Sequence, residues 1–330
     1  MIAVLAICAG AWWWISRDEV PATAKVTSVV EAVTVYPAEA ARATAAPSPH
    51  GVAPMPPTTL PLRDSAASLR SRADAGDSLA ACRLGVELLR CVELGHMGPD
   101  HDRWWASRQA ELEAKGDDSG ASEIAVTRSG LARLREECAD VPEALVSQGH
   151  RYFRQAALAG EPEAMIRYAV GETLMMGPSN FAFLGTPRFD EWRREAPQVL
   201  MAALESGTPE AALLLGSAHR EEQGYLAMLL PRDEVVARAS MELTHRLFGE
   251  DPALPGLVNA TPLQDEQAAE ATRLAAEWHV RHFGGAQRVL ADSTGALLPP
   301  RNRIAPLDGG PQYPGTPRAT PCGDTRIRAP

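Results

Sequence analysis

Two histidines spaced one helical turn apart are the clearest candidates for metal chemistry in the sequence. His279 and His282 stand in the segment AEWHVRHFGG, close to Glu277. Two imidazoles at this spacing can bind one zinc ion, but a third ligand must come from elsewhere in the chain. The alternative is a helix end, where histidine interacts favourably with the last carbonyl groups. We therefore predict no metal site and keep a metal-dependent envelope hydrolase that uses these histidines as the alternative function.

A second pattern pairs glutamate with histidine. Glu93-x-x-His96 and Glu242-x-x-His245 have the spacing found in the helices of di-iron bundles. Gly95 and the polar run ELGHMGPDHD indicate a loop at the first of these, and two more bridging glutamates would be needed. The sequence contains no G-x-S-x-G and no HExxH motif. We predict a protein that is not an enzyme and that has no cofactor.

The charge of the chain argues against a nucleic-acid partner. The sequence has 32 Lys and Arg against 42 Asp and Glu, and residues 62–283 carry 23 basic and 35 acidic side chains, a net charge of -12. Such a surface repels phosphate backbones. Lys25 and Lys115 are the only lysines, and neither stands in a GxxxxGK[ST] loop, which excludes that nucleotide-binding motif.

The amino terminus is apolar from Ile2 to Ile15 and becomes charged immediately afterwards. This stretch is shorter than the ~20 residues of a typical transmembrane helix, but Trp12–Trp14 suit the aromatic belt of a membrane interface. We expect residues 1–16 to form an uncleaved signal anchor, tethered through residues 2–15 to a bacterial inner membrane, with the body in the periplasm. The alternatives are a buried core helix, cleavage at Ala22–Ala24 and lipidation of Cys8.

Five cysteines occur: Cys8, Cys82, Cys91, Cys138 and Cys322. In an oxidising compartment, two of the three in the body are expected to pair. Cys82 and Cys91 lie about 13 Å apart along one predicted helix, which is too far for a disulfide. Cys91 and Cys138 both lie near predicted helix ends, so we favour a bond between them that adds about 4 kcal/mol of stability. The alternatives are Cys82–Cys138 and three reduced thiols.

Three glycines share one local pattern, in SRADAGDSLAACRLG, QAALAGEPEAMIRYA and MAALESGTPEAALLLG. Aligned on Gly76, Gly160 and Gly207, each segment has a large apolar residue seven positions earlier and an alanine or leucine three positions earlier. These two positions are four residues apart, so they share one helix face. The glycine can supply the left-handed residue that ends the helix.

The segments that follow the glycines also agree. Apolar residues recur four, six and eight positions after each glycine, and position nine holds Gly85, Ala169 or Gly216. Small residues at a fixed position let two helix axes approach closely. The pattern predicts antiparallel helix pairs, cornered at the three glycines, whose remaining apolar faces stack on neighbouring pairs.

This pattern resembles a known repeat family. FRQAALAGEPEAMIRYA resembles the W-x-x-KAA-x-x-G-x-x-x-A-x-x-x-LG core of Sel1-like repeats, which are relatives of tetratricopeptide repeats, and DAGDSLAACRLG and LESGTPEAALLLG resemble it more loosely. The glycines are 84 and 47 residues apart rather than regularly spaced, and the family's Gly-rich loop is absent. The resemblance implies an all-α, degenerate helical-hairpin array, or α-solenoid, that acts as an adaptor or scaffold.

The distribution of prolines indicates which parts of the chain lie outside the helical domain. Seven of 27 lie in residues 37–61 and eight in 299–330, in stretches with little apolar periodicity. We predict a disordered Pro/Ala-rich linker at 17–61, a helical repeat domain at 62–283 with an insertion at 92–140, and a disordered Pro/Gly-rich tail at 284–330. Helices are expected near 65–75, 78–90, 103–115, 122–136, 143–159, 162–175, 197–206, 209–222, 232–247 and 262–282.

Two adjacent tryptophans stand within the insertion. Trp104 and Trp105 cannot both face one core stripe, so one of them is expected to be exposed and available to a partner. The alternative is that both pack beneath the insertion. We predict a non-catalytic, membrane-tethered periplasmic adaptor that binds another, unidentified envelope protein.

Overall fold

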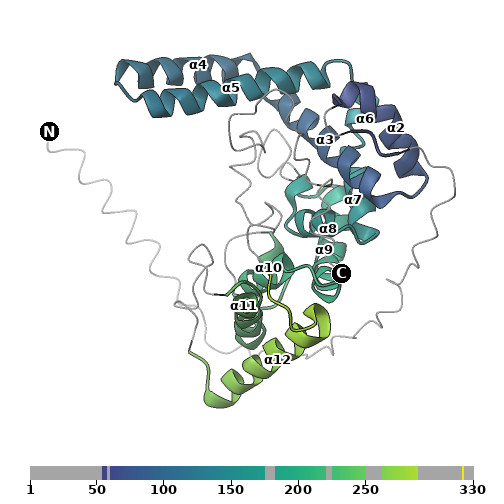
Figure 1. Ribbon diagram of the computed structural model, residues 1–330, viewed down its shortest axis with the longest axis vertical. Helices are drawn as coiled ribbons and strands as arrows, with labels where there is room; N and C mark the ends of the chain where they lie inside the picture. The colour runs from purple at the N-terminus through teal and green to yellow at the C-terminus, as the bar shows by residue number, and fades with distance from the viewer. Residues whose placement is uncertain are drawn as a thin grey trace, which may run out of the picture. The chain divides into compact units, whose positions relative to one another are not determined.

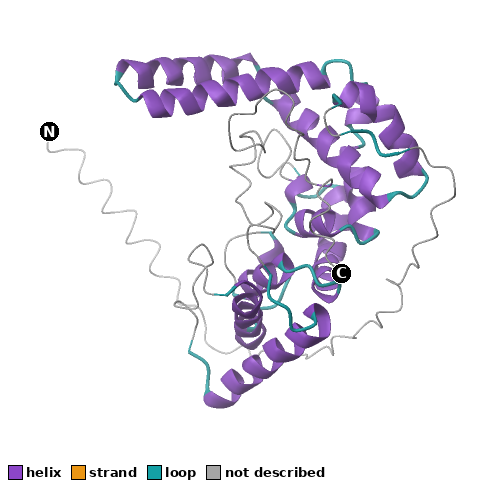
Figure 2. Ribbon diagram, in the orientation of Figure 1, coloured by secondary structure: helices purple, strands orange, loops and turns teal. Residues whose placement is uncertain are grey.

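The computed structural model describes residues 54–57, 60–174, 183–220, 225–249 and 262–288, together with Cys322. All of these belong to one compact unit of the chain, Ala43–Pro330. Within these ranges the regular structure is helical and contains no strand (Figure 2), so the predicted all-α class is confirmed for this part of the chain. The predicted anchor at 1–16 and nearly all of the predicted linker and tail lie outside these ranges.

Figure 1 shows the helices of the described residues, which follow one another along the chain. They are α2 (Leu62–Asp74), α3 (Ser78–His96), α4 (Pro99–Ala114), α5 (Asp118–Cys138), α6 (Glu143–Val146), α7 (Gly149–Leu158), α8 (Pro162–Ala169), the 3-10 helix η2 (Glu172–Leu174), α9 (Pro187–Glu205), α10 (Glu210–His219), the 3-10 helix η3 (Leu226–Met228), α11 (Glu234–Phe248) and α12 (Asp265–Phe283). In the described residues no helix is both long enough and apolar enough to cross a bilayer.

The three predicted corners have one geometry. Gly76, Gly160 and Gly207 have φ values of +94°, +88° and +81°, which favour glycine. At each corner the glycine N–H donates to the carbonyl three residues earlier, and the next N–H donates to the carbonyl four residues before the glycine, at 2.9–3.1 Å. These bonds satisfy carbonyl groups left unpaired at the helix end, as in a Schellman motif. The corners therefore join α2 to α3, α7 to α8 and α9 to α10.

A fourth corner of the same kind lies inside the predicted insertion. Gly116 has a φ of +71°, its N–H donates to Glu113 O, and the Asp117 N–H donates to Leu112 O, both at 3.0 Å. The predicted insertion is thus a helix pair, α4–α5 (Figure 1), and its two helices lie close to those expected near 103–115 and 122–136. The glycine alignment missed it because Gln109 and Glu113 occupy the positions that are apolar in the other three segments.

The helices outside α4–α5 pack in chain order. Contacts join α2 to α3, α3 to α7, α7 to α8, α8 to α9, α9 to α10, α10 to α11 and α11 to α12. A chain of nearest-neighbour contacts leaves each pair to bury its apolar faces against the pairs before and after it. One buried core results, and it includes Leu69, Phe153, Ile166, Trp192 and Leu204.

Small residues sit where neighbouring helices touch. A Cβ added to Gly85 of α3 would lie 2.6 Å from the Phe153 backbone nitrogen in α7, and one added to Gly216 of α10 would lie 3.0 Å from Met241 Sδ in α11. Both glycines stand nine positions after a corner, where the alignment predicts close approach of helix axes. The position therefore sets the distance between successive pairs.

Several predicted helix bounds were wrong. The predicted helix 143–159 is broken between α6 and α7, and 162–175 ends at Ala169 before the left-handed Gly171. Helix α9 begins at Pro187, ten residues before the predicted start, because Thr186 caps it by accepting the Phe189 N–H at 3.2 Å. Helix α12 is capped by Gln264 and Gln267, and the left-handed Gly284 ends it.

Candidate functional site

A disulfide ties the base of the α4–α5 pair. Cys91, near the end of α3, is bonded to Cys138 at the last residue of α5, with 5.6 Å between the two Cα atoms. This is the pairing favoured from the sequence, and the rival Cys82–Cys138 pairing is wrong because Cys82 is bonded to another residue. The bond and the contacts of α5 with α2 and α3 fix the pair at its base.

The two tryptophans of α4 differ in exposure. Trp104 is 57% exposed, whereas Trp105 is partly buried. Their rings meet edge to face with centroids 4.7 Å apart, and Trp105 Nε1 donates to His101 Nε2 at 3.0 Å. Trp105 thus holds the exposed ring of Trp104 in a defined orientation. An amphipathic aromatic ring held in this way is typical of a residue that anchors a protein interface.

His279 and His282, the candidate metal ligands, lie at the end of α12. His279 Nε2 lies 3.1 Å from the carbonyl oxygen of Ala286, just beyond the helix. Glu277 is engaged by Arg273 at 2.9 Å and by Arg281 at 2.6 Å. In the described part of the chain, no group of three or more His, Cys, Asp or Glu side chains is placed to hold a metal ion. The neighbourhood of His279 and His282 therefore provides a helix end and its ion pairs.

The two glutamate–histidine patterns belong to separate helices. Glu93 and His96 lie within α3, so the prediction that this stretch is a loop was wrong: the helix continues through Gly95 to His96. Glu242 lies in α11 and accepts from Arg238 Nε at 2.9 Å. The helices that carry the two patterns, α3 and α11, are not among the helix pairs of the described residues that pack closely against each other. A shared di-iron site therefore has no support from the packing.

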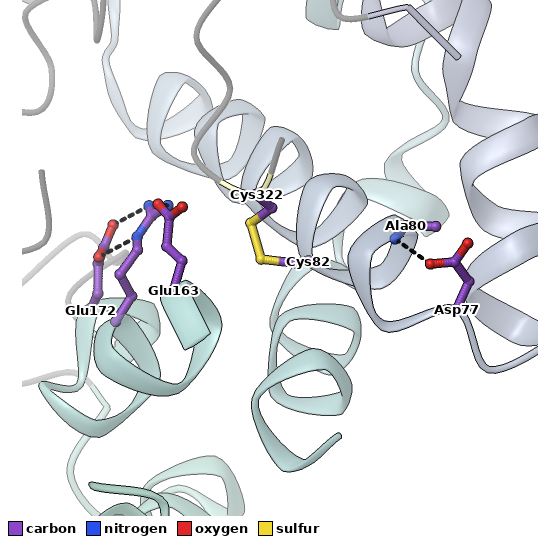
Figure 3. Close-up of a disulfide and its surroundings, with 7 residues drawn as sticks. Asp77, Ala80, Cys82, Glu163, Glu172 and Cys322 are labelled. Atoms are coloured by element: carbon purple, nitrogen blue, oxygen red, sulfur yellow. Dashed lines mark hydrogen bonds and ion pairs between the residues drawn. A yellow bond between two sulfur atoms is a disulfide. The ribbon is translucent and has the colours of Figure 1, made fainter. Parts of the chain in front are cut away.

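Sequence reasoning missed a second disulfide. Cys82, near the start of α3, is bonded to Cys322, which is 3% exposed (Figure 3). The two residues are 240 positions apart, and the prediction placed Cys322 in a disordered tail. The odd number of cysteines in the helical body was the available signal, because it leaves one body thiol to pair elsewhere.

A buried ion cluster fills the junction after α8. Arg167 donates through Nε to Glu172 Oε2 at 2.7 Å and lies 3.4 Å from Glu163 Oε1 (Figure 3). All three residues are at most 7% exposed. The guanidinium also lies 5.3 Å from the ring centroid of Phe153. Two carboxylates and an aromatic face compensate the desolvation of this charge, so the cluster is structural.

A second polar cluster links α7, α8 and α9. Arg154 Nε and Tyr168 Oη both donate to Glu195 Oε2 at 2.8 Å. Burial raises the pKa of the Glu195 carboxyl, but the hydrogen bonds from Arg154 and Tyr168 outweigh it and hold the pKa below its usual value. Burial and the bond to Glu195 raise the pKa of Tyr168. The cluster leaves Tyr168 protonated and Glu195 ionised, which suits cross-helix bonding.

His150 borders this cluster without joining it. Its ring lies 6.1 Å from that of Tyr168, and neither ring nitrogen has a hydrogen-bond partner among the described residues. Burial, together with the charges of Arg188 and Arg154, lowers the pKa of His150 to about 3. The imidazole is therefore neutral at physiological pH, and its surroundings oppose protonation.

The chain was compared with protein-family models, with curated proteins and with solved structures, and none of them matches it. The helix pairs, the two disulfides and the exposed Trp104 are therefore the features that bear on function.

Proposed function

We propose that this chain is a membrane-tethered periplasmic helical-repeat adaptor that binds another envelope protein. The single observation that supports it best is the chain-order packing of helix pairs with equivalent glycine corners. Stacked pairs of this kind form α-solenoids, whose extended surfaces bind other proteins. The sequence resemblance to Sel1-like repeats points to the same class of protein, by analogy.

The α4–α5 pair is the proposed partner-binding surface. Trp104 presents an exposed ring on α4, and the Cys91–Cys138 disulfide fixes the pair at its base. An anchor held rigidly before binding loses less conformational entropy when a partner covers it. We propose that Trp104 inserts into an apolar pocket of the partner, with Trp105 as its support.

The two disulfides support the proposed compartment. Disulfides persist in the bacterial periplasm and are rare in the cytosol. Peptide mapping without reductant, on protein alkylated before the cells are opened, tests this placement. We expect Cys91–Cys138 and Cys82–Cys322 peptides to be recovered, and alkylated free thiols at all four positions would contradict it.

Comparative recovery of binding proteins tests the adaptor role. The full-length chain is isolated from detergent-solubilised envelope as wild type, as Trp104→Ala and as Met228→Ala, a matched control at a residue that is 66% exposed. We expect one protein to accompany the wild type and the control and to be lost with Trp104→Ala. A set of companions that is identical for all three forms would contradict the proposed surface.

The alternative hydrolase predicted from the sequence requires His279 and His282 to bind metal. His279 contacts a main-chain carbonyl group and Glu277 is held by two arginines, and these contacts favour the adaptor. Metal analysis of the purified full-length chain decides between the two. Stoichiometric zinc, iron or manganese that is lost in His279→Ala would favour the hydrolase over the adaptor.

A further inference from the structure

Helix α3 holds two distant parts of the chain at neighbouring residues. Cys82 is bonded to Cys322, and Arg83 donates to the main-chain carbonyl oxygens of Pro56 and Pro57, the second from Nη2 at 2.9 Å. Arg83 is only 2% exposed. Its guanidinium therefore makes these bonds inside the protein, where they are electrostatically stronger than in water.

The contact has the chemistry of peptide recognition. Pro56 and Pro57 lack an N–H group, so this segment offers carbonyl oxygens alone along those two residues. The planar guanidinium has donors that can reach two successive carbonyl groups at once. Met55 is partly buried and packs against the core, which adds a side-chain contact to the main-chain bonds. Proline-rich segments are bound by other proteins at low cost in entropy, because their extended conformation is already formed.

The first and second helix pairs differ in the groups that accept from their buried arginine. Arg83 and Arg167 both lie seven residues after their corner glycines, and both are buried. The two buried carboxylates that bind Arg167 lie three and twelve residues after Gly160. The same positions after Gly76 hold Leu79 and Leu88, which offer no acceptor. At the first pair the carbonyl oxygens of the linker accept from the arginine instead.

We propose that the surface of α3 around Arg83 is a binding site for an extended proline-containing peptide, and that residues 54–57 occupy it in cis. The ligand class is a segment in which an apolar side chain precedes two prolines, as in Met55-Pro56-Pro57. A partner that carries such a segment displaces the linker of this chain. The site is separate from Trp104, so the proposal does not rest on the α4–α5 surface.

Because residues 54–57 are joined to α2 by a short stretch of chain, they compete strongly with any separate peptide for the site. Only residues 58–61 separate Pro57 from the first residue of α2. Short flexible tethers give effective concentrations in the mM range, so a peptide in trans must compete with a segment that is always present. The linker thereby restricts the site to ligands that bind more tightly than its own sequence.

Peptide binding to the full-length chain tests this. The probe is a fluorescein-labelled peptide of residues 53–59, APMPPTT, and its affinity is measured by fluorescence anisotropy. The emptied variant Met55→Asp/Pro56→Gly/Pro57→Gly changes no helical residue. We expect it to bind the probe at least about tenfold more tightly than the wild type, because the competitor in cis is lost. The control Pro47→Gly/Pro49→Gly, in the same linker, should bind the probe as the wild type does.

Two further comparisons identify the contacts. In the emptied variant, Arg83→Lys keeps the charge but removes the planar fork, and we expect at least a tenfold loss of probe binding. If Arg83→Lys fails to fold, the same question is decided by a probe with aspartate in place of methionine, which should bind at least tenfold more weakly. The proposal is overturned if the emptied variant binds the probe no more tightly than the wild type, or binds both probes equally.

Discussion

The helix pairs α2–α3 and α7–α8 have the same corner and the same buried arginine but different partners for that charge. Gly76 and Gly160 share their φ region and their hydrogen-bond pattern. In α7–α8 the guanidinium of Arg167 is held by carboxylates of its own pair and the segment after it, whereas in α2–α3 the guanidinium of Arg83 binds the main chain of the linker. The two corners therefore share one backbone conformation, while the arginine seven residues after the glycine has a different partner in each pair.

The difference has an energetic consequence. A buried ion cluster makes little net contribution to stability when complete, but removing one partner leaves a desolvated charge. The carboxylates at the second pair come from α8 and from η2, which follows it directly, so this arginine is held without the linker. The first pair places its arginine against a segment outside the helices, so it can exchange that segment for a ligand.

The largest effect is expected from removing a carboxylate from the buried Arg167 cluster. Glu172→Ala removes the carboxylate closest to Arg167 and should lower the free energy of unfolding by about 3–5 kcal/mol, because the buried guanidinium loses its main partner. Urea denaturation measures it. The control Glu191→Ala, whose carboxylate is partly exposed and 4.0 Å from Arg154, should cost less than about 1 kcal/mol. Equal losses in both variants would show that the Arg167 cluster is not desolvated.

The next effect concerns the small residue nine positions after each corner. Gly85→Ala places a methyl group 2.6 Å from the Phe153 nitrogen and should cost about 2–3 kcal/mol, because both helix backbones must shift. The second pair already holds alanine at this position, Ala169, so Ala169→Gly should cost only about 1 kcal/mol. Thermal or urea unfolding compares the two. A neutral Gly85→Ala variant would refute the close approach of α3 and α7.

The pairs should also differ in their response to acid. His150 stands ten residues before Gly160, where the first pair has Ala66. Burial lowers the pKa of His150 to about 3 from an ordinary value of 6.5, so below pH 6.5 the unfolded chain binds the proton first and stability is lost as the pH falls. Between pH 6.5 and 4.5 this loss should reach about 2 kcal/mol. His150→Asn should flatten the pH dependence in that window, and an unchanged profile would contradict the burial.

The smallest effects are expected at the corners themselves. Gly76→Ala and Gly160→Ala should each cost about 1 kcal/mol, since a Cβ meets the same left-handed backbone and no neighbour within 4 Å at either site. Gly207→Ala should cost more than either, because its Cβ would lie 2.8 Å from the carbonyl oxygen of His282. Unfolding of the three variants under one condition gives the comparison. Unequal costs at Gly76 and Gly160 would break the equivalence of the two pairs.

Local signals in the sequence predicted the corners, the all-α class and most helix positions. Helix ends depend on residues close in sequence, such as Gly160 and Pro162, and the alignment could therefore find them. The α4–α5 corner at Gly116 escaped because the polar residues Gln109 and Glu113 replace the apolar pattern there. The early start of α9 escaped because it depends on the Thr186 cap, which lies outside the segment aligned on Gly207.

Contacts between distant residues could not be predicted in the same way. The bond from Cys82 to Cys322 spans 240 residues, and the contact of Arg83 with Pro57 joins a helix to a segment with no regular structure. Neither leaves a periodic signal in the sequence. The Glu163–Arg167 pair did leave one, four residues apart on a helix, but only burial distinguishes it from a surface pair.

Amide hydrogen exchange at three residues tests the equivalence of the helix pairs most directly. The N–H groups of Asp77, Glu161 and Thr208 each donate to the carbonyl four residues before a corner glycine, at 2.9–3.0 Å. In NMR measurements on the full-length chain we expect all three amides to exchange much more slowly than in an unfolded peptide. Exchange of any one of them at the unfolded rate while the others stay protected would contradict a shared corner.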